Sequence, residues 1–236
     1  MAIKKLTQKL TSELKNLELL AQSFFSKGKD KVENEVPYVS QFAHPEYAEK
    51  ILKDNVSETS DPDWRKTGAV SVDEYARWVL TTCGMACTAM ALRFFNDQPV
   101  EVITLAKDAL THDVYKVDGS ELSSMHYREY ADWVKKYRLK AVVYSRLSIA
   151  GIQKLLSSGH LVIVSVNPNV RGFETANNKQ KGGHLVLLTG YNKLTKTITL
   201  HNPSGFVSNN SQVNQTLSTG DFISHYAGRG ISLAFQ

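Results

Sequence analysis

The first 25 residues carry apolar side chains at the spacing of an amphipathic helix. The apolar positions recur every seven residues, at Ile3, Leu10, Leu17 and Phe24. This period predicts a helix over residues 3–25. The next residues, 26–35, are polar and charged, which predicts a linker. We therefore divide the chain into an N-terminal helix with its linker, residues 1–35, and a single larger domain, residues 36–236.

The first part of the larger domain has the pattern of helices joined by loops. Ser71 is followed three residues later by Glu74, a capping-box spacing that marks a helix start. Apolar residues after Gly84 also keep a helical spacing, and residues 56–70 have the composition of a loop. Helices are predicted over 72–80, from 84 onward, over 100–111 and over 121–137.

After residue 138 the pattern changes to short β-rich runs. Strands are predicted over 140–145, 161–167, 184–191, 196–202 and 231–235. Helices are predicted over 148–157 and 221–228, and the polar run 207–212 predicts a turn or an edge. The clearest hairpin joins 184–191 to 196–202. Helices that precede an antiparallel sheet are typical of the α+β class.

Composition and charge narrow the classes of function. The formal net charge is +5, too small and too diffuse to indicate nucleic-acid binding. No run of about 18 apolar residues is present, so no transmembrane segment is predicted. The N-terminus lacks the apolar core of a secretory signal, and we expect a cytoplasmic protein. The N-terminal helix offers a surface for self-association or for a partner.

Two cysteines, Cys83 and Cys87, are the only ones in the chain. Their spacing predicts neither a disulfide framework nor a zinc site, and we expect no cofactor. Cys83 stands where a loop becomes a helix. Unpaired N–H groups at a helix start stabilise a thiolate, and Gly84 lets a substrate approach the backbone. Cys87, one turn later, has the apolar neighbours of a buried structural cysteine.

His184 opens the most apolar strand directly after two glycines, which leave room beside the imidazole. An odd-length turn would pair Tyr191 with Thr197 and Val186 with Asn202. Asn202 would then lie diagonally beside His184 on the same face, where its side-chain oxygen orients the ring. A two-residue turn would place Asn202 on the opposite face. His160 and His201 are alternative bases, and Asp221 is an alternative to Asn202.

These segments also resemble a known family. TTCGMACTAMALRFF resembles the nucleophile motif of papain-clan cysteine peptidases, closest to the group of bacteriocin leader (double-glycine) peptidases. GGHLVLLTGYN resembles the histidine motif, HNPSG the third-residue motif, and VPYVSQF the segment that supplies the oxyanion glutamine. The resemblance runs from about Val36 to Phe235. It implies a papain-like fold with a helical N-terminal part packed on an antiparallel sheet.

The resemblance also implies roles for individual residues. Cys83 is the nucleophile, His184 the base, Asn202 the residue that orients the base, and Gln41 an oxyanion donor together with the Cys83 backbone N–H. Close relatives more often carry Asp where this chain has Asn202. The gap from Gln41 to Cys83 is longer than in the family, so residues 43–80 must form an insertion that returns the chain to the site.

The implied function is a thiol-dependent hydrolase that cleaves a peptide or related amide bond in a peptide or protein substrate. Two alternatives remain open. An amine acceptor in place of water would make the enzyme an acyltransferase of the transglutaminase type. A chain that kept the fold and lost catalysis would be a peptide-binding module.

Overall fold

The structure is a computed structural model that describes residues 28–119, 121–172 and 181–236, together with Leu10, Thr11, 13–15, 17–19 and Ala21. The described residues between 10 and 21 are helical, in agreement with the predicted amphipathic helix. The predicted positions Ile3 and Phe24 lie outside the described residues.

The described α-helices are α2 (Tyr47–Leu52), α3 (Val72–Val79), α4 (Cys83–Asn96), α5 (Val102–Leu110), α6 (Tyr127–Trp133), α7 (Ile149–Ser157) and α8 (Thr219–His225). Short 3-10 helices lie at Glu58–Ser60, Trp64–Thr67, Val134–Tyr137 and Pro168–Arg171. The strands are β1 (Lys31–Glu33), β2 (Val117–Asp118), β3 (Glu121–Leu122), β4 (Leu139–Tyr144), β5 (Leu161–Val166), β6 (His184–Asn192), β7 (Thr197–His201), β8 (Gln215–Ser218) and β9 (Tyr226–Phe235).

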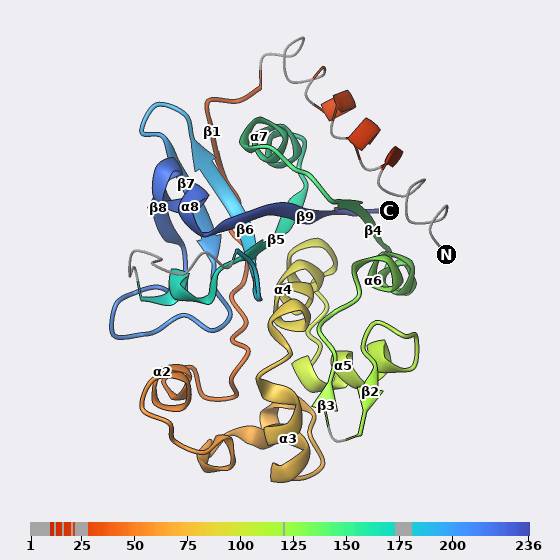
Figure 1. Cartoon of the computed structure of the whole chain (residues 1–236), viewed down its shortest axis with the longest axis vertical. Coiled ribbons are helices and arrows are strands. Elements are labelled where there is room, and N and C mark those ends of the chain that lie inside the picture. The colour runs from red at the N-terminus through yellow and green to blue at the C-terminus, as the bar shows by residue number, and fades with distance from the viewer. Residues whose placement is uncertain are drawn as a thin grey trace.

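The main sheet has seven strands in the order β4-β9-β5-β6-β7-β8, and β1 pairs with β6. Every strand pair in it is antiparallel. Figure 1 shows the helices α2, α3 and α5 gathered at one end of the molecule, with the sheet at the other and α4 between them. The predicted α+β class is confirmed.

The pairing of β1 corrects the predicted linker. Lys31, Val32 and Glu33 pair with Asn192, Tyr191 and Gly190 of β6. The Tyr191 hydroxyl also donates to the Lys29 carbonyl oxygen at 2.6 Å. Segment 26–35 has the short, charged sequence of a linker. Three of its residues nevertheless form a strand, whose main-chain N–H and C=O groups pair with β6.

Several other boundaries also differ from the prediction. The helix predicted over 121–137 is split into β3, α6 and a 3-10 turn, and α8 ends at His225 so that β9 begins five residues before its predicted start. The elements α2 and β8 were not predicted. Both are short, with six and four residues, so each carries too few positions for a clear periodic pattern.

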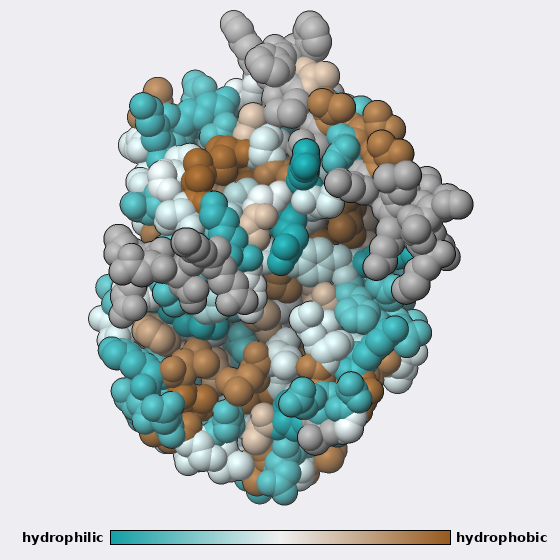
Figure 2. Space-filling view, viewed as in Figure 1, coloured by the Kyte–Doolittle hydropathy of each residue, from teal (hydrophilic) through white to brown (hydrophobic). Residues whose placement is uncertain are grey.

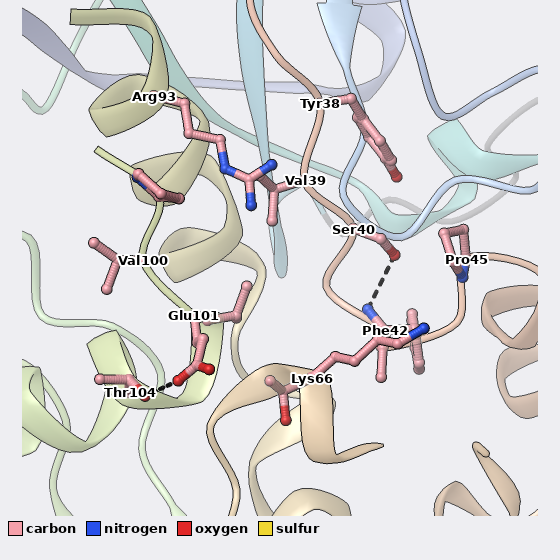
Figure 3. Close-up of a pocket in the computed structure, with 14 residues that line it drawn as sticks. Tyr38, Val39, Ser40, Phe42, Pro45, Lys66, Arg93, Val100, Glu101 and Thr104 are labelled. Carbon is pink, nitrogen blue, oxygen red and sulfur yellow. Dashed lines mark hydrogen bonds between the residues drawn. The ribbon is translucent and has the colours of Figure 1, made fainter. Parts of the chain in front are cut away.

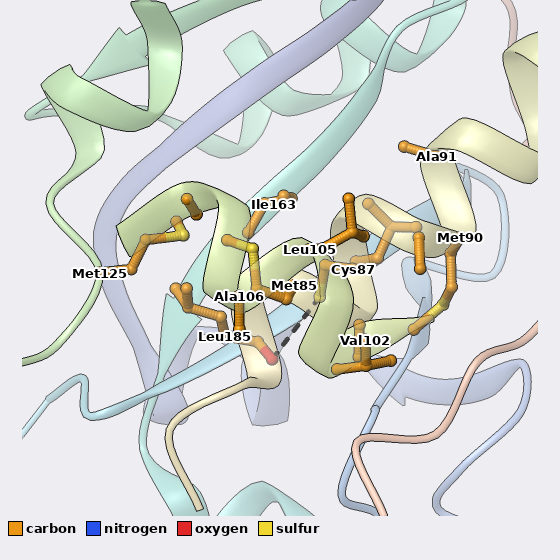
Figure 4. Close-up of a cluster of buried hydrophobic side chains, with 14 of the residues drawn as sticks. Met85, Cys87, Met90, Ala91, Val102, Leu105, Ala106, Met125, Ile163 and Leu185 are labelled. Atoms are coloured by element: carbon orange, nitrogen blue, oxygen red, sulfur yellow. Dashed lines mark hydrogen bonds between the residues drawn. The ribbon is translucent and has the colours of Figure 1, made fainter. Parts of the chain in front are cut away.

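Helix α4 forms the centre of the core. Every residue from Gly84 to Leu92 is buried, so this helix has no solvent-facing side over its first two turns. Figure 4 shows Met85, Cys87 and Met90 of α4 among side chains of α5 and the sheet, with Leu185 nearby. Two helices, α7 and α8, pack over a second cluster that includes Val162 and Val186. Alternate residues of β5 and β6 thus face opposite layers.

The start of α4 is fixed by the end of α3. Ser71 caps α3 by accepting from the Glu74 N–H at 3.1 Å, as the capping-box spacing predicts. At its other end the Thr82 hydroxyl donates to the Val79 carbonyl at 3.1 Å. The axes of α3 and α4 meet at 94°, and the sharp bend turns the first residue of α4 into the site described below.

No single described helix is long and apolar enough to cross a membrane, and the bent pair of α3 and α4 passes only by combined length and composition. The N-terminal helix presents apolar side chains to solvent. Leu10, Leu14 and Leu17 are 52%, 60% and 59% exposed. Figure 2 shows a brown, hydrophobic region at the upper right, on the side where Figure 1 draws the N-terminal segment. Leu19 instead packs against the cluster beneath α7.

Candidate active site

Cys83 is the first residue of α4, as its position between a loop and a helix predicts. Its thiol is partly exposed, whereas Cys87 is fully buried. Gly84 has no room for a side chain, because a Cβ atom there would lie 2.6 Å from the Met125 sulfur and 3.0 Å from a Leu185 methyl group. A glycine therefore lets Met125 and Leu185 close in beside the cysteine.

Cys83 and His184 line one cleft, with a volume of about 480 Å³. The other residues that line it are Leu80, Thr81, Ser124, Met125, Tyr127, Ser165, Gly183, Leu185 and Arg229. They come from the α3–α4 turn, the start of α6, and strands β5, β6 and β9. The cleft thus lies where the helical part meets the sheet, and each part supplies one of the two reactive groups.

The imidazole of His184 is held by hydrogen bonds on one side. Its Nε2 lies 2.8 Å from the Asn202 side-chain oxygen. That oxygen also accepts from the Ser204 backbone N–H at 3.2 Å, which fixes the orientation of the Asn202 amide. Because an amide oxygen only accepts, Nε2 must carry the proton. The other ring nitrogen, Nδ1, is then the one with a free lone pair.

A longer hydrogen-bond chain continues behind the imidazole. The Ser204 hydroxyl lies 3.1 Å from His184 Nε2 and accepts from Arg171 Nε at 2.8 Å. His184 is 2% exposed, and Asn202 and Ser204 are fully buried. Ser204 and Arg171 were not predicted from the sequence. Ser204 lies within the HNPSG motif, which is a usable signal, whereas nothing in the sequence around Arg171 marks it.

The hairpin register explains how Asn202 reaches His184, and it corrects the predicted turn. The turn is 193–196, and Tyr191 pairs with Ile198 rather than with Thr197. This even-length turn alone would place Asn202 on the face of the sheet opposite to His184. A β-bulge between Leu188 and Gly190 shifts the register by one residue, so that Leu187 pairs with His201. The bulge restores the offset that puts Asn202 beside His184.

Gly190, at the bulge, lets strand β1 approach β6 closely. A Cβ atom at Gly190 would lie 2.4 Å from the Val32 carbonyl oxygen of β1. The Thr189 carbonyl in turn accepts from the Asn34 N–H at 3.0 Å. The strand formed by part of the predicted linker therefore holds the bulge in place, and through it the relative position of His184 and Asn202.

The electrostatics of the site differ from the expectation for a helix start. Burial raises the pKa of the Cys83 thiol above its ordinary value of 9.0, although backbone hydrogen bonds with Leu185 and Gly84 and the charge of Arg171 act in the opposite direction. Burial, and then the Arg171 charge, holds the pKa of His184 well below 6.5. Burial thus disfavours the charged form of both the thiol and the imidazole.

Gln41 is buried at 3% exposure and does not line the cleft. Its side-chain Nε2 donates to the Val79 carbonyl at 2.6 Å, and its backbone N–H donates to the Pro203 carbonyl at 2.7 Å. Segment 43–80 therefore returns the chain to within a few residues of Cys83, as the long gap requires. Gln41 lies between the turn that precedes Cys83 and the segment that follows Asn202.

A second cavity of about 570 Å³ lies on the other side of this segment. Tyr38, Val39 and Ser40 form one wall, and Arg93, Glu101 and Lys66 face them (Figure 3). The larger volume does not make it the reactive site, because neither cysteine nor His184 lines it. Its wall still touches the site, since the Tyr38 hydroxyl donates to the Asn202 carbonyl at 3.0 Å.

The fold and this placement of a cysteine on a helix start and a histidine on a strand define the papain-like class of cysteine peptidase folds. A family model agrees. Residues 33–231 match the peptidase C39-like family, so the chain belongs to that family. No curated protein sequence matches the chain.

Solved structures with a similar fold were also found. A C39-like peptidase from Bacillus anthracis is 14% identical, with a TM-score of 0.53 over 88% of this chain and 99% of that one. The peptidase domain of Streptococcus ComA, a bifunctional ABC transporter involved in quorum sensing, is 15% identical, with a TM-score of 0.41 over 66% of this chain and 93% of that one. Membership in the family, with the first of these folds, supports an enzyme of the cysteine peptidase type.

Proposed function

We propose that the protein is a thiol-dependent hydrolase that cleaves a peptide or related amide bond through an acyl-enzyme on Cys83. One observation carries the proposal. The Cys83 thiol shares a cleft with an imidazole whose Nε2 is bonded to Asn202, which leaves Nδ1 unprotonated. A nucleophile, a base and a group that orients the base are the parts that acyl transfer needs.

In the proposed reaction His184 Nδ1 removes the thiol proton as the sulfur attacks the substrate carbonyl carbon. The imidazolium then donates a proton to the leaving amine, and the thioester remains on Cys83. Water, deprotonated by the same nitrogen, attacks the thioester carbonyl and releases the acid and the thiol.

The negative oxygen that develops on the carbonyl needs donors nearby. We propose the Cys83 backbone N–H, at the free start of α4, and the Gln41 amide. One of the two Gln41 Nε2 protons is used by the Val79 carbonyl, and the second reaches an oxyanion only if the side chain turns toward the cleft, which Gln41 does not line. A Gln41→Ala variant should lose about 10²-fold in kcat if this second proton acts in the reaction.

The proposal is tested by alkylating the reduced protein with iodoacetamide and locating the adducts by mass spectrometry. Preferential labelling of Cys83 is expected from its exposure alone, so it does not establish a catalytic role. The informative result is whether the labelling rate at Cys83 depends on His184. In His184→Ala the rate at Cys83 should fall, while labelling of Cys87 after unfolding stays unchanged.

A second readout measures cleavage directly. The protein is incubated with a mixture of peptides, and new termini are identified by mass spectrometry. Cys83→Ser should produce no new termini above background, and Cys87→Ala, checked for native folding, should cleave at the wild-type rate. A wild-type protein that yields no new termini, with Cys83 labelling indifferent to His184→Ala, would contradict the proposal and indicate a binding module.

A further inference from the structure

Arg229 is the one permanently charged side chain among the described residues that line the cleft. The other lining residues are neutral at pH 7, since the pKa of His184 is held low. Within the described part of the chain, no carboxylate forms an ion pair with Arg229. A guanidinium that faces a cleft without a counter-charge is available to a ligand.

A break in the sheet places Arg229 in the cleft. Strand β9 pairs with β5 at Gly230↔Val164 and at Tyr226↔Val166, and the register shifts between these two pairs. The three residues 227–229 of β9 therefore lie opposite the single residue Ser165 of β5. Gly228 has a φ of +75°, and its carbonyl accepts from the Leu147 N–H at 2.7 Å. Bulges of this kind redirect a side chain beside a site.

Neighbouring groups hold the guanidinium against the backbone that leads to His184. Arg229 Nη2 donates to the Ser165 hydroxyl at 3.4 Å, and the Tyr127 hydroxyl interacts with both Ser165 and Arg229. A Cβ atom at Gly182 would lie 2.8 Å from Nη2. The glycine two residues before His184 thus makes space for the guanidinium.

We propose that Arg229 binds a carboxylate of the substrate, and that the cleft selects acidic peptides. This inference rests on the proposed function and names the substrate class of the same site. Planar guanidinium groups bind carboxylates with two parallel hydrogen bonds. Arg229 has five N–H donors, and its partners are neutral hydroxyl groups, with the bond to Ser165 as long as 3.4 Å. The donors that remain face a cleft in which no lining side chain is acidic.

The test compares two reagents that alkylate Cys83. Iodoacetate carries a carboxylate, and iodoacetamide is its neutral isostere. The ratio of their rates cancels any effect of a variant on the thiol pKa, since both reagents require the thiolate. The ratio at Cys83 should exceed that of N-acetylcysteine amide in the same buffer. In Arg229→Gln it should fall about tenfold, and in Arg229→Lys by a smaller factor.

Arg128→Gln is the matched control. Arg128 lies on α6 next to Tyr127, is exposed, and does not line the cleft. This variant loses one positive charge, as Arg229→Gln does, but outside the cleft. The ratio of the two alkylation rates at Cys83 should therefore stay near the wild-type value. Thermal unfolding verifies that each variant is folded. A ratio unchanged in Arg229→Gln, with rapid His184-dependent labelling by iodoacetamide, would overturn this inference and leave the proposed function intact. No His184-dependent labelling by either reagent would overturn both.

The carboxylate has two sources, an acidic side chain or a free C-terminus. Three peptides separate them as protectors of Cys83 against iodoacetamide: acetyl-Gly-Glu-Gly-amide, acetyl-Gly-Gln-Gly-amide and acetyl-Gly-Gly-Gly with a free carboxylate. Protection by the first alone assigns a side chain, and protection by the third alone assigns a C-terminus. Either protection should be lost in Arg229→Gln. Equal protection by all three, or none by either acidic peptide, contradicts the inference.

Discussion

The thiol side and the imidazole side of the cleft are held in different ways. His184 is 2% exposed, and its Nε2 is bonded within a chain of buried polar groups. Cys83 is partly exposed, and backbone groups of Leu185 and Gly84 are its hydrogen-bond neighbours. The base is therefore oriented by side chains from distant parts of the sequence, whereas the nucleophile is positioned by the backbone at the start of a helix.

The difference has a consequence for reactivity. Side-chain hydrogen bonds fix the tautomer of His184, yet burial and Arg171 disfavour its charged form. The same burial disfavours the thiolate of Cys83. The fixed tautomer of His184 thus determines which ring nitrogen accepts the thiol proton. The charge that forms during the reaction must be stabilised by the oxyanion donors and by the substrate.

The largest expected effect comes from removing the base. His184→Gln leaves a polar side chain of similar size that cannot accept the thiol proton, so cleavage should fall by about 10²–10⁴-fold. The measurement is the rate of peptide cleavage at pH 7. His112→Gln, at an exposed histidine after α5, is the control and should retain full activity. Equal activity in both variants would mean that His184 is only structural.

The next effect concerns the residue that orients the base. Asn202→Ala removes the acceptor that fixes the Nε2–H tautomer, and cleavage should fall by about 10²-fold. Asn202→Asp should keep the geometry and add a negative charge, which raises the pKa of His184. The base must be neutral to act, so activity is lost as pH falls through that pKa. The acid limb of the pH–rate profile should therefore move to higher pH in Asn202→Asp.

The hairpin shows how far sequence reasoning reaches. Local patterns predicted the strands, and family motifs indicated both His184 and Asn202. The register was predicted through an odd-length turn, while the structure uses an even turn and a bulge. An isolated glycine in a strand is a usable sign of a bulge, and Gly190 supplies it. The sequence did not indicate that β1 packs against Gly190, because the two segments are far apart in the chain.

The charged groups around the site were harder to predict. Arg171 and Arg229 stand in segments whose local sequence has no motif. One reaches the imidazole through Ser204, and the other enters the cleft through a β-bulge. The expectation that a helix start lowers the thiol pKa failed for a related reason. The N–H groups of a helix start follow from local sequence, whereas the burial that raises the pKa of Cys83 depends on tertiary packing.

A smaller effect should come from Arg171, whose charge acts on both the thiol and the imidazole. The Arg171 charge lowers the pKa of both His184 and Cys83. Arg171→Gln should therefore raise both pKa values, slowing iodoacetamide labelling at pH 7 by about threefold and moving the acid limb of cleavage upward in pH. The pH–rate profiles of labelling and of cleavage check the two shifts separately. A shift in labelling alone would show that Arg171 acts on the thiol and not on the base.

The smallest effect should come from the N-terminal helix, which the sequence left open as a partner surface or a self-association surface. Its described residues Lys15, Glu18 and Leu19 line a surface pocket with β4 and α7, and none of them lines the cleft. Deleting residues 1–26 keeps Lys29 and β1, which the sheet needs. Labelling of Cys83 by iodoacetamide should then stay within about twofold of wild type, because neither the cleft nor its charges change. A large increase in rate would instead show that the N-terminal segment covers the cleft and limits access to the Cys83 thiol.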